Sequence, residues 1–427
     1  MSNITRRNFI KVIGSATAIG LTEFPMISLG KSSGRVVVIG GGYGGATAAK
    51  YLRLADPSIQ VTLIEKKPQY VSCPMSNEVL SGERNMDSIS VSYNSLGAHH
   101  GINVVPARVT EIDPVKRNVH TANGQDFQYD RLIVSPGIDF RWGAIEGYDR
   151  DATEVMPHAW NAGPQTVLLR QQLMAMKDGG VVIIVAPPNP FKCPPGPYER
   201  ASQMAYYLKQ HKPKSKILIL DQKDKFSKQG LFKQGWAQHY PGIITWVAGT
   251  NDGRVTGVDT ESMTVFTEFE EHQGDVINVI PPQQAGEIAQ RAGLTDQSGW
   301  CPVNQKTFES TIHQNVHVIG DASIAGKMPK SGYAANSQGK VCATAVAALM
   351  NSKTVVEPSY VNTCYSLITP KHGVSVAAVY QLNQEGQIVG VKGAGGASPI
   401  NATPWQREME AMHAHSWFRN IISDTFH

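Results

Sequence analysis

The sequence predicts an α/β protein, with two Rossmann-like dinucleotide-binding domains and a smaller C-terminal α+β domain. Apolar runs at residues 36–39 and 181–186 are typical of parallel strands that are buried on both faces of a sheet. Each run is followed by a helix and a further strand, which is the order of a βαβ unit. After residue 350, alternating segments at 375–381 and 387–392 flank a polar Asn-Gln-Glu-Gly turn at 383–386, a pattern that indicates a hairpin.

Length, composition and charge exclude several classes of protein. The 427 residues are too many for a single hydrophobic core and predict two or three domains. A content of 41% hydrophobic and 17% charged residues excludes disordered, collagen-like and coiled-coil proteins. The formal net charge is +4, and residues 1–31 hold four basic residues against one acidic residue. Since the rest of the chain is close to neutral, no nucleic-acid-binding surface is expected.

The N-terminus carries a targeting pattern. Residues 5–11 (Thr-Arg-Arg-Asn-Phe-Ile-Lys) resemble a twin-arginine export signal, in which two arginines precede a short, weakly apolar stretch. Here that stretch covers residues 12–21, is interrupted by Gly14 and Gly20, and is too short to span a bilayer. The alternative is an ordinary basic tail. We expect residues 1–31 to be a twin-arginine signal without an evident cleavage site, the mature protein to be periplasmic, and no transmembrane segment to follow.

The first βαβ unit carries a glycine pattern that is typical of dinucleotide sites. Gly40, Gly42 and Gly45 fit G-x-G-x-x-G between the strand at 36–39 and a helix predicted at 46–54. Such glycines let a pyrophosphate approach backbone N–H groups, and Glu65, after the strand at 60–64, is placed to bind ribose hydroxyls. The alternative is an ordinary Gly-rich turn, but all the elements follow in the expected order. The neighbouring residues assigned to the same site are Tyr43, Gly44 and Lys66.

Two later segments favour FAD over NAD. Residues 129–137 resemble a segment of two-dinucleotide (glutathione-reductase-like) flavoproteins, with Ser135-Pro-Gly137 in place of Ala-Thr-Gly. Residues 316–322 are predicted to be a strand that ends in Gly320-Asp321, and in those flavoproteins the aspartate binds the ribityl chain. The next helix, which runs through Met350, would direct its positive end at the flavin. The resemblance implies an FAD site that includes Val109, Ser135, Gly137, Gly320, Asp321, Ser331, Gly332, Tyr333 and Ala334.

The second βαβ unit lacks a phosphate-binding turn. After the strand at 181–186, residues 187–199 read Pro-Pro-Asn-Pro-Phe-Lys-Cys-Pro-Pro-Gly-Pro-Tyr-Glu, followed by a helix predicted at 200–211 and a strand at 216–220. Proline has no N–H to donate, so this segment is not suited to hold a pyrophosphate. NAD(P)H is therefore not expected as the electron partner at this face, where Cys193 stands instead.

These residues resemble a specific family. The segments 193–199 and 299–303 (Gly-Trp-Cys-Pro-Val) and the run 328–338 are similar to the flavoprotein subunit of flavocytochrome c sulfide dehydrogenase, and the similarity extends over essentially the whole chain. Sulfide:quinone oxidoreductase is its relative. The resemblance implies a sulfide:cytochrome-c oxidoreductase that oxidises hydrogen sulfide to sulfur or polysulfide and passes electrons from FAD to a c-type cytochrome subunit. The chain has no Cys-x-x-Cys-His, so the haem would belong to a separate polypeptide.

The same resemblance assigns three of the five cysteines. Cys73 would bond to the 8α-methyl carbon of the flavin, whereas the alternative is a buried free thiol. Cys193 and Cys364 would form a redox-active disulfide, whereas the alternative is a purely structural bridge. Glu199 would handle protons beside this disulfide, and Trp417 would lie near the flavin. Of the other two, Cys342 is expected in the core and Cys301 has no assigned role.

The predicted organisation places the partner at the C-terminal end. Residues 34–145 and 285–355 would form the FAD-binding domain, 146–284 the second fold, and 356–427 a cytochrome-interface domain. The helix predicted at 405–426 mixes basic and acidic residues on its polar face (Arg407, Glu408, Glu410, Arg419 and Asp424), which favours docking on the core over a membrane-surface anchor. The alternatives are a sulfide:quinone oxidoreductase and a noncatalytic exported flavoprotein that transfers electrons. The histidines show no ligand spacing, and no metal site is expected.

Overall fold

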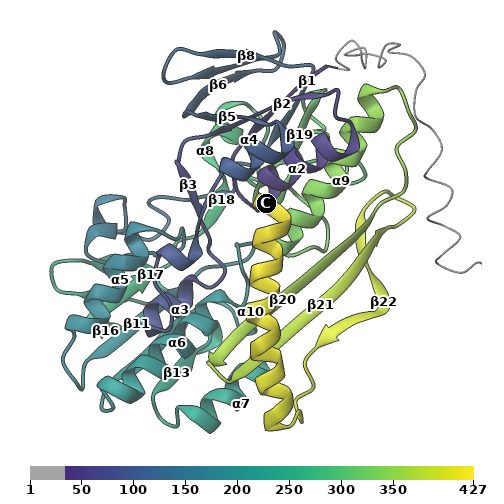
Figure 1. Cartoon of the computed structure of the whole chain (residues 1–427). Helices are drawn as coiled ribbons and strands as arrows, with labels where there is room; N and C mark the ends of the chain where they lie inside the picture. The colour runs from purple at the N-terminus through teal and green to yellow at the C-terminus, as the bar shows by residue number, and fades with distance from the viewer. Residues whose placement is uncertain (1–33) are drawn as a thin grey trace, which may run out of the picture.

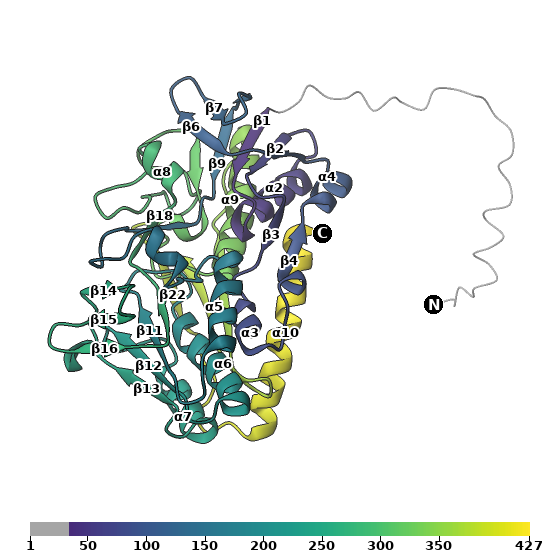
Figure 2. The same cartoon turned by 90° about the vertical axis from the view of Figure 1, so that its left-hand side faces the viewer.

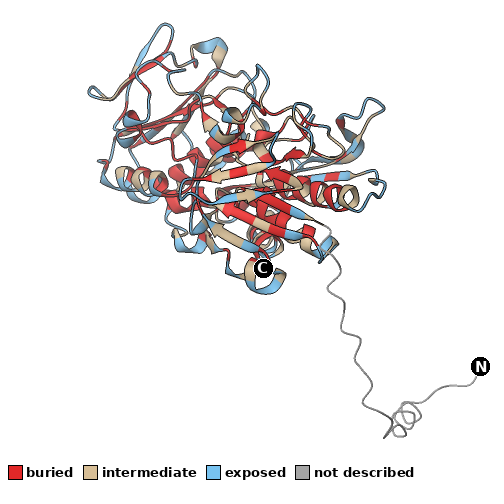
Figure 3. Ribbon diagram, turned by 90° about the horizontal axis from the view of Figure 1, so that it is seen from above, coloured by how far each residue is buried: buried red, intermediate tan, exposed pale blue. Residues whose placement is uncertain are grey.

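The computed structural model of the chain describes residues 34–427. The export signal predicted at residues 1–31 lies outside the described residues. Two parallel sheets and one long antiparallel sheet carry the fold, and a long C-terminal helix runs beside the antiparallel sheet (Figure 1). Buried residues concentrate in the strands and on the helix faces that cover them (Figure 3).

The first parallel sheet has the strand order β19-β9-β1-β2-β5. Its strands are β19 (Val316–Val318), β9 (Arg131–Val134), β1 (Arg35–Ile39), β2 (Gln60–Glu65) and β5 (Asn103–Pro106). Helices α2 (Tyr43–Ala55) and α9 (Gly332–Met350) pack against each other beside it. The predicted helix at 46–54 begins three residues earlier, because Gly42 takes the N-cap position and the following glycines continue the helix without steric conflict.

The second parallel sheet has the order β13-β12-β11-β17. It consists of β13 (Ile244–Val247), β12 (Lys216–Asp221), β11 (Val181–Ala186) and β17 (Val276–Val279), with helices α5 (Pro164–Ala175), α6 (Gly196–His211) and α7 (Gln229–His239). Helix α6 begins four residues before the predicted start at 200. Its first turn includes Pro197, which is tolerated there because the first helical N–H groups have no intrahelical partner.

Smaller elements connect and edge these sheets. Helix α3 (Ser76–Ser81) packs against α5 and α6 (Figure 2). The remaining strands are β3 (Gln69–Val71), β4 (Ser90–Ser92), β6 (Val109–Asp113), β7 (Asn118–Thr121), β8 (Asp126–Gln128), β10 (Ile138–Phe140), β14 (Gly257–Asp259), β15 (Thr264–Phe266), β16 (Glu271–Gln273) and β18 (Gln283–Ala285). The remaining helices are α4 (Asn94–His100), α8 (Glu287–Arg291) and the 3-10 turns η1 (Asp87–Ile89), η2 (Asp151–Glu154), η3 (Gly249–Asn251) and η4 (Gly320–Ala322).

The C-terminal part is an antiparallel sheet crossed by one helix. Strands β20 (Ser359–Thr369), β21 (His372–Leu382) and β22 (Ile388–Ala397) pair in order, and the β21–β22 connection confirms the hairpin predicted around 383–386. Helix α10 (Pro404–Phe426) lies on β21 and reaches α2, so it docks on the core as expected (Figure 1).

One residue of α10 was placed wrongly from the sequence. Arg407, which we expected on the polar face, is only 3% exposed. Its guanidinium lies 3.1 Å from the Glu410 carboxylate and donates to the Pro399 carbonyl at 2.6 Å. The local ion pair and the chain that precedes the helix therefore cover a side chain that helical periodicity alone leaves in solvent.

The side chain of Glu78 connects helix α3 to the C-terminal helix α10. The carboxylate is hydrogen-bonded to His415 Nε2 of α10 at 2.7 Å and to Arg84 Nε at 2.8 Å. Burial raises the pKa of Glu78, but the hydrogen bonds from His415 and Arg84 outweigh it and hold the pKa below the ordinary value of 4.5.

Glu78→Gln should lower the free energy of unfolding by about 2–3 kcal/mol at neutral pH, because two charged hydrogen bonds are lost. Since the folded-state pKa lies below 4.5, this stabilisation is present above that value and is lost as the pH falls through the lower folded pKa. Urea denaturation of both proteins should therefore show a difference that shrinks in acid. Glu408→Gln, which removes an exposed pair with Lys371, is the control and should change little. A difference that is equal at both pH values would contradict this prediction.

Candidate active site

In the glycine turn after β1, a ligand would meet the protein backbone rather than side chains. Gly40 has a φ of 95°, and a Cβ there would lie 2.3 Å from the Ser135 carbonyl oxygen. A Cβ on Gly45 would lie 1.9 Å from the Gly40 carbonyl oxygen, and one on Gly44 would lie 2.7 Å from Ser135 Oγ. Side chains are therefore excluded where β1, β9 and α2 meet, and the N-terminal end of α2 stays open to an anion.

An acidic side chain closes the same turn at the end of β2. Glu65 Oε2 accepts a hydrogen bond from the Gly41 N–H at 2.8 Å, and Oε1 accepts one from the Lys67 N–H at 2.9 Å. Lys66 beside it is exposed. Val109 begins β6, and the Ala107 N–H two residues earlier donates to the Glu65 carbonyl at 3.1 Å. The residues assigned to an adenosine moiety thus lie at the ends of neighbouring strands.

Asp321 in η4 supplies an acceptor that the protein leaves unused. Its Oδ1 atom is buried and has no hydrogen-bond partner within residues 34–427. Burial raises the pKa of Asp321, while the charges of Lys192 and Lys330 oppose that rise. Because a buried acceptor without a donor is costly, a ligand hydroxyl fits this position. This orphaned oxygen and the glycine cradle together fit an FAD with its ribityl chain at Asp321.

The start of α9 is held firmly beside this cradle. Ser331 accepts a hydrogen bond from the Ala334 N–H at 3.1 Å and donates to Asn362 Oδ1 of β20 at 2.6 Å. A Cβ on Gly332 would lie 2.8 Å from the Tyr43 ring, so α9 approaches α2 closely. The Tyr43 hydroxyl itself shares a hydrogen bond with Ser72 Oγ at 2.7 Å. The capped, positive end of the helix is therefore fixed in orientation.

Trp417 brings helix α10 to the same region. Its ring stacks on Tyr333 with centroids 6.2 Å apart, and its Nε1 is buried without a partner among the described residues. In the segment between β9 and β10, Gly137 has a φ of 67°, and its carbonyl accepts the Gly286 N–H at 2.9 Å. Gly320 has a φ of 75° and donates its N–H to Gln338 of α9 at 2.8 Å.

Cys73 lies beside a lysine that the sequence did not single out. Lys192 Nζ is 3.4 Å from Cys73 Sγ and 3.0 Å from Asn161 Oδ1. The thiol also contacts the Trp160 carbonyl oxygen at 3.5 Å. Nothing in the sequence pattern indicated Lys192, because it lies 119 residues from Cys73 and meets it only through the fold. The partly buried Cys73 thiol therefore has a lysine and a backbone carbonyl as its neighbours.

Cys193 occupies the loop where the second fold would hold a phosphate. The residue has a φ of 57°, unusual for a side chain with a Cβ, and its N–H donates to the Lys330 carbonyl at 2.7 Å. Burial raises the pKa of the Cys193 thiol well above its ordinary value, the charges of Cys364 and Glu199 raise it further, and Lys228 opposes them. Cys193, Cys364 and Glu199, from a loop, from β20 and from α6, are thus close enough to influence each other.

Glu199 and Cys364 are positioned by partners from other elements. Glu199 Oε1 accepts the Leu367 N–H of β20 at 2.8 Å, and Oε2 accepts from Asn77 Nδ2 at 3.1 Å. Burial raises the pKa of Glu199. Asn362 Nδ2 lies 3.6 Å from Cys364 Sγ. The five cysteines are unbonded in this structure, and Cys301 and Cys342 are fully buried.

In the second fold, the protein's own side chains occupy the place where a dinucleotide fold would bind its nucleotide. Asp221 ends β12, where a dinucleotide fold presents a carboxylate to ribose, yet it is completely buried. It accepts hydrogen bonds from Tyr198 at 2.5 Å and Trp246 at 3.1 Å and pairs with Lys223 at 2.6 Å. The carboxylate is therefore satisfied within the protein. This closure was not evident from the sequence, which showed only the missing glycines.

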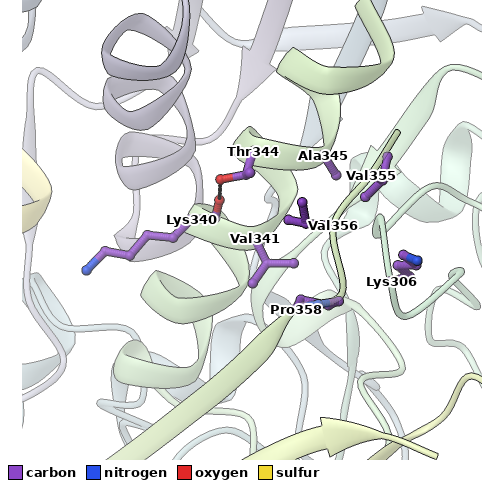
Figure 4. Close-up of a pocket in the computed structure, with 8 residues that line it drawn as sticks. All are labelled: Lys306, Lys340, Val341, Thr344, Ala345, Val355, Val356 and Pro358. Atoms are coloured by element: carbon purple, nitrogen blue, oxygen red, sulfur yellow. Dashed lines mark hydrogen bonds between the residues drawn. The ribbon is translucent and has the colours of Figure 1, made fainter. Parts of the chain in front are cut away.

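A separate apolar pocket lies away from these residues. It is lined by the second half of α9 and the segment before β20 and has a volume of about 180 Å³ (Figure 4). The Lys340 amine points away from it, toward Asp424 at 2.8 Å. Within residues 34–427, no cluster of three or more His, Cys, Asp or Glu side chains is arranged to hold a metal, and none of the helices has the length and apolarity to cross a membrane.

Family models match three parts of the chain. The model described as the central part of the sulfide dehydrogenase [flavocytochrome c] flavoprotein chain matches residues 166–281. The model for the flavin-binding part of flavocytochrome c sulphide dehydrogenase matches residues 356–426. A pyridine nucleotide-disulphide oxidoreductase model matches residues 34–173.

Individual relatives agree with these matches. The flavoprotein chain of sulfide dehydrogenase [flavocytochrome c] from Chlorobaculum thiosulfatiphilum is 67% identical over 45 residues, which are 10% of this chain and 94% of that sequence. Sulfide-quinone reductase of Aquifex aeolicus is 32% identical over 182 residues, 43% of this chain and 41% of that protein, so the match spans less than half of its length.

A solved structure of sulfide:quinone oxidoreductase from Aquifex aeolicus superposes with a TM-score of 0.69 at 18% identity, covering 91% of this chain and 92% of that one. At this identity the superposition shows the fold, and it confirms the predicted two-dinucleotide flavoprotein architecture. Together with the family models and the Chlorobaculum sequence, these comparisons show that the chain belongs to the family of sulfide-oxidising flavoproteins that includes the flavoprotein chain of flavocytochrome c sulfide dehydrogenase and sulfide:quinone oxidoreductase.

Proposed function

We propose that this chain is the flavoprotein subunit of a flavocytochrome c sulfide dehydrogenase, which oxidises hydrogen sulfide and passes the electrons to a c-type cytochrome chain. The observation that carries the proposal is the pair of hydrogen bonds that gather Cys193, Cys364 and Glu199. The Cys193 N–H donates to the Lys330 carbonyl just before α9 at 2.7 Å, and Glu199 accepts at 2.8 Å from the Leu367 N–H of β20, the strand that carries Cys364. Two thiols, a buried carboxyl and a flavin cradle from four separate elements form one site. Family membership supports a sulfide substrate and FAD.

In the proposed reaction, hydrosulfide attacks a disulfide between Cys193 and Cys364. A new S–S bond forms to one cysteine, and the old bond breaks with its electron pair on the other, which becomes a thiolate. Glu199 takes the proton of the new persulfide, for which its raised pKa is suited. Bound FAD would accept two electrons and supply them to the cytochrome. As those electrons leave, the thiolate and the persulfide re-form the Cys193–Cys364 disulfide, and the outer sulfur is released at the zero-valent level, as sulfur or, on a further hydrosulfide, as polysulfide.

The second fold is proposed to work without NAD(P)H. Prolines occupy the turn after β11, and Asp221 already has three partners inside the protein. A nicotinamide dinucleotide would have to break those contacts and would find too few backbone donors for its pyrophosphate. That face of the second fold is therefore available to the loop that carries Cys193.

We further propose that the flavin is attached covalently through Cys73. The position of Cys73 supports this, because the neighbouring Ser72 is hydrogen-bonded to Tyr43 of the flavin cradle at 2.7 Å. Export by the twin-arginine route to the periplasm, with residues 356–427 facing the cytochrome, belongs to the same proposal. The alternatives are electron transfer to a quinone and a noncatalytic electron-transfer role.

The two cysteines can be tested separately from flavin binding. Cys193→Ser and Cys364→Ser should each abolish the reduction of the bound flavin by sulfide, while the flavin content stays unchanged. The loss of flavin absorbance after addition of sulfide measures this reduction. The reason is that either change removes the disulfide that hydrosulfide must open. Cys342→Ala, on the far part of α9, is the matched control and should react normally. Normal turnover in either serine variant would exclude the disulfide mechanism.

Acid-denatured wild-type protein should remain yellow, because a thioether to Cys73 survives unfolding. Cys73→Ala should release its flavin completely under the same conditions, whereas Cys193→Ser should retain it. Fluorescence of the protein band on a denaturing gel measures the covalent fraction. If flavin is freely removed from the wild-type protein, the attachment at Cys73 is wrong.

The electron acceptor distinguishes the proposal from its alternatives. On addition of sulfide, the protein should reduce a soluble c-type cytochrome at least about tenfold faster than it reduces a soluble quinone analogue. A factor of ten in rate corresponds to a difference of about 1.4 kcal/mol in activation free energy between the two routes. Spectrophotometry of each acceptor measures the rates. Faster reduction of the quinone would favour sulfide:quinone oxidoreductase, and reduction of neither would favour the noncatalytic role.

A further inference from the structure

Lys228 directs its charge into the cluster of cysteines and Glu199. It stands at the N-cap of α7 with a φ of 61°, so its backbone turns in a conformation that is uncommon for a lysine. Its Nζ donates to Ser366 Oγ at 2.8 Å, and the carbonyl oxygens of Cys364 and Val374 lie 3.4 and 3.5 Å away. These acceptors come from β20 and β21, so the ammonium group bridges α7 to the strand that carries Cys364.

Among the described residues, no carboxylate lies within ion-pair distance of this ammonium group, and its nearest acceptors are all neutral. Burial lowers the pKa of Lys228, and the charges of Cys364, Glu199, Cys193 and Glu410 oppose that effect. Glu410 is already paired with Arg407 at 3.1 Å and accepts from Ser375 at 2.9 Å. Within residues 34–427, the positive charge of Lys228 is therefore not neutralised by another ion pair and acts on the two thiols and Glu199.

An unpaired cation in a partly buried position is costly unless a negative charge appears there at some stage. Opening a disulfide creates such a charge. Hydrosulfide enters as an anion, one S–S bond replaces another, and the released cysteine keeps an electron pair as a thiolate. The carboxyl group of Glu199 becomes negative whenever it is ready to accept a proton. Lys228 interacts electrostatically with both cysteines and Glu199, and its Nζ lies 3.4 Å from the backbone carbonyl oxygen of Cys364 itself.

We propose that Lys228 is a charge-stabilising residue of the sulfide-oxidising reaction, whose ammonium group compensates the thiolate released from the Cys193–Cys364 disulfide and keeps Glu199 available as a base. The inference rests on the proposed function and adds a residue to it. A fixed cation that faces a developing negative charge in a site of low dielectric lowers the barrier without reorganisation. The Ser366 hydrogen bond and the Phe232 ring, whose centroid lies 5.9 Å from Nζ, hold the side chain in place.

The test compares Lys228→Met, Lys228→Gln and Lys228→Arg in the FAD-loaded protein. After chemical reduction of the disulfide, the rate of iodoacetamide alkylation of Cys193 and Cys364 is followed against pH by mass spectrometry. The neutral variants should shift the alkylation profile of the more reactive thiol to higher pH by about one unit, which is about tenfold slower alkylation at neutral pH. Lys228→Arg should keep most of the wild-type profile because it keeps the charge.

The other titratable groups that face the two sulfurs remain in every variant. They are Glu199 and Arg200 from α6, Cys73 from the loop after β3 and Tyr380 from β21. The matched control is Lys233→Met, on the same helix, whose amine lies over the Trp246 ring, 4.5 Å from its centroid. It should leave the alkylation profile unchanged. Profiles of Lys228→Met and Lys228→Gln that coincide with that of the wild type would overturn the inference.

A second measurement separates this inference from the proposed function. The rate of flavin reduction by sulfide should fall about tenfold or more at neutral pH in the two neutral variants and recover as the pH rises. If the wild-type protein reduces its flavin and Lys228→Met does so equally fast, Lys228 has no such role although the function stands. If sulfide does not reduce the wild-type flavin, the function fails, while the alkylation profile still decides whether Lys228 stabilises the thiolates. The flavin content shows that each variant has folded, and Lys228→Gln replaces Lys228→Met if the latter does not bind FAD.

Discussion

The hydrogen bond from the Cys193 amide to the Lys330 carbonyl, at 2.7 Å, joins the two dinucleotide folds at the proposed reaction site. Cys193 belongs to the turn after β11 of the second fold, and Lys330 precedes α9 of the first. The flavin cradle and the cysteine loop therefore share one backbone contact. Because Ser331 next to Lys330 also binds Asn362 of β20, the same junction sets the position of the strand that carries Cys364.

The second fold keeps the frame of a nucleotide-binding domain while its chemistry has changed. The parallel sheet and the helix after β11 remain, but the carboxylate of Asp221 is enclosed by Tyr198, Trp246 and Lys223. A buried carboxylate with three partners at the end of the inner strand β12 has no capacity left for ribose. The loop is thereby free to carry a cysteine to the flavin side. This arrangement supports the proposal that a small inorganic reductant, rather than a dinucleotide, reacts at this face.

The C-terminal helix completes the site from the opposite side. Trp417 of α10 stacks on Tyr333 at the start of α9, and His415, two residues earlier, binds Glu78 of α3. These two contacts tie α10 to α3 and to α9, and α3 in turn packs against α5 and α6 of the second fold. Such cross-links between separately folded layers limit how far the cysteines and the flavin cradle can move apart, which matters for a reaction that passes between sulfur atoms and a cofactor.

The sequence by itself determined the elements whose signals are local. The apolar runs, the Gly40–Gly45 turn and the β21–β22 hairpin each follow from a few adjacent residues, and so does the proline loop around Cys193. The strand predicted to run up to Asp321 is shorter: β19 ends at Val318, and Asp321 lies in the turn η4. The tertiary structure alone decided which distant side chains meet. Lys192 reaches Cys73, Lys228 reaches Ser366 beside Cys364, and Arg407 is buried against Glu410, because contacts between residues far apart in the chain, or under a covering loop, leave no periodic pattern in the sequence.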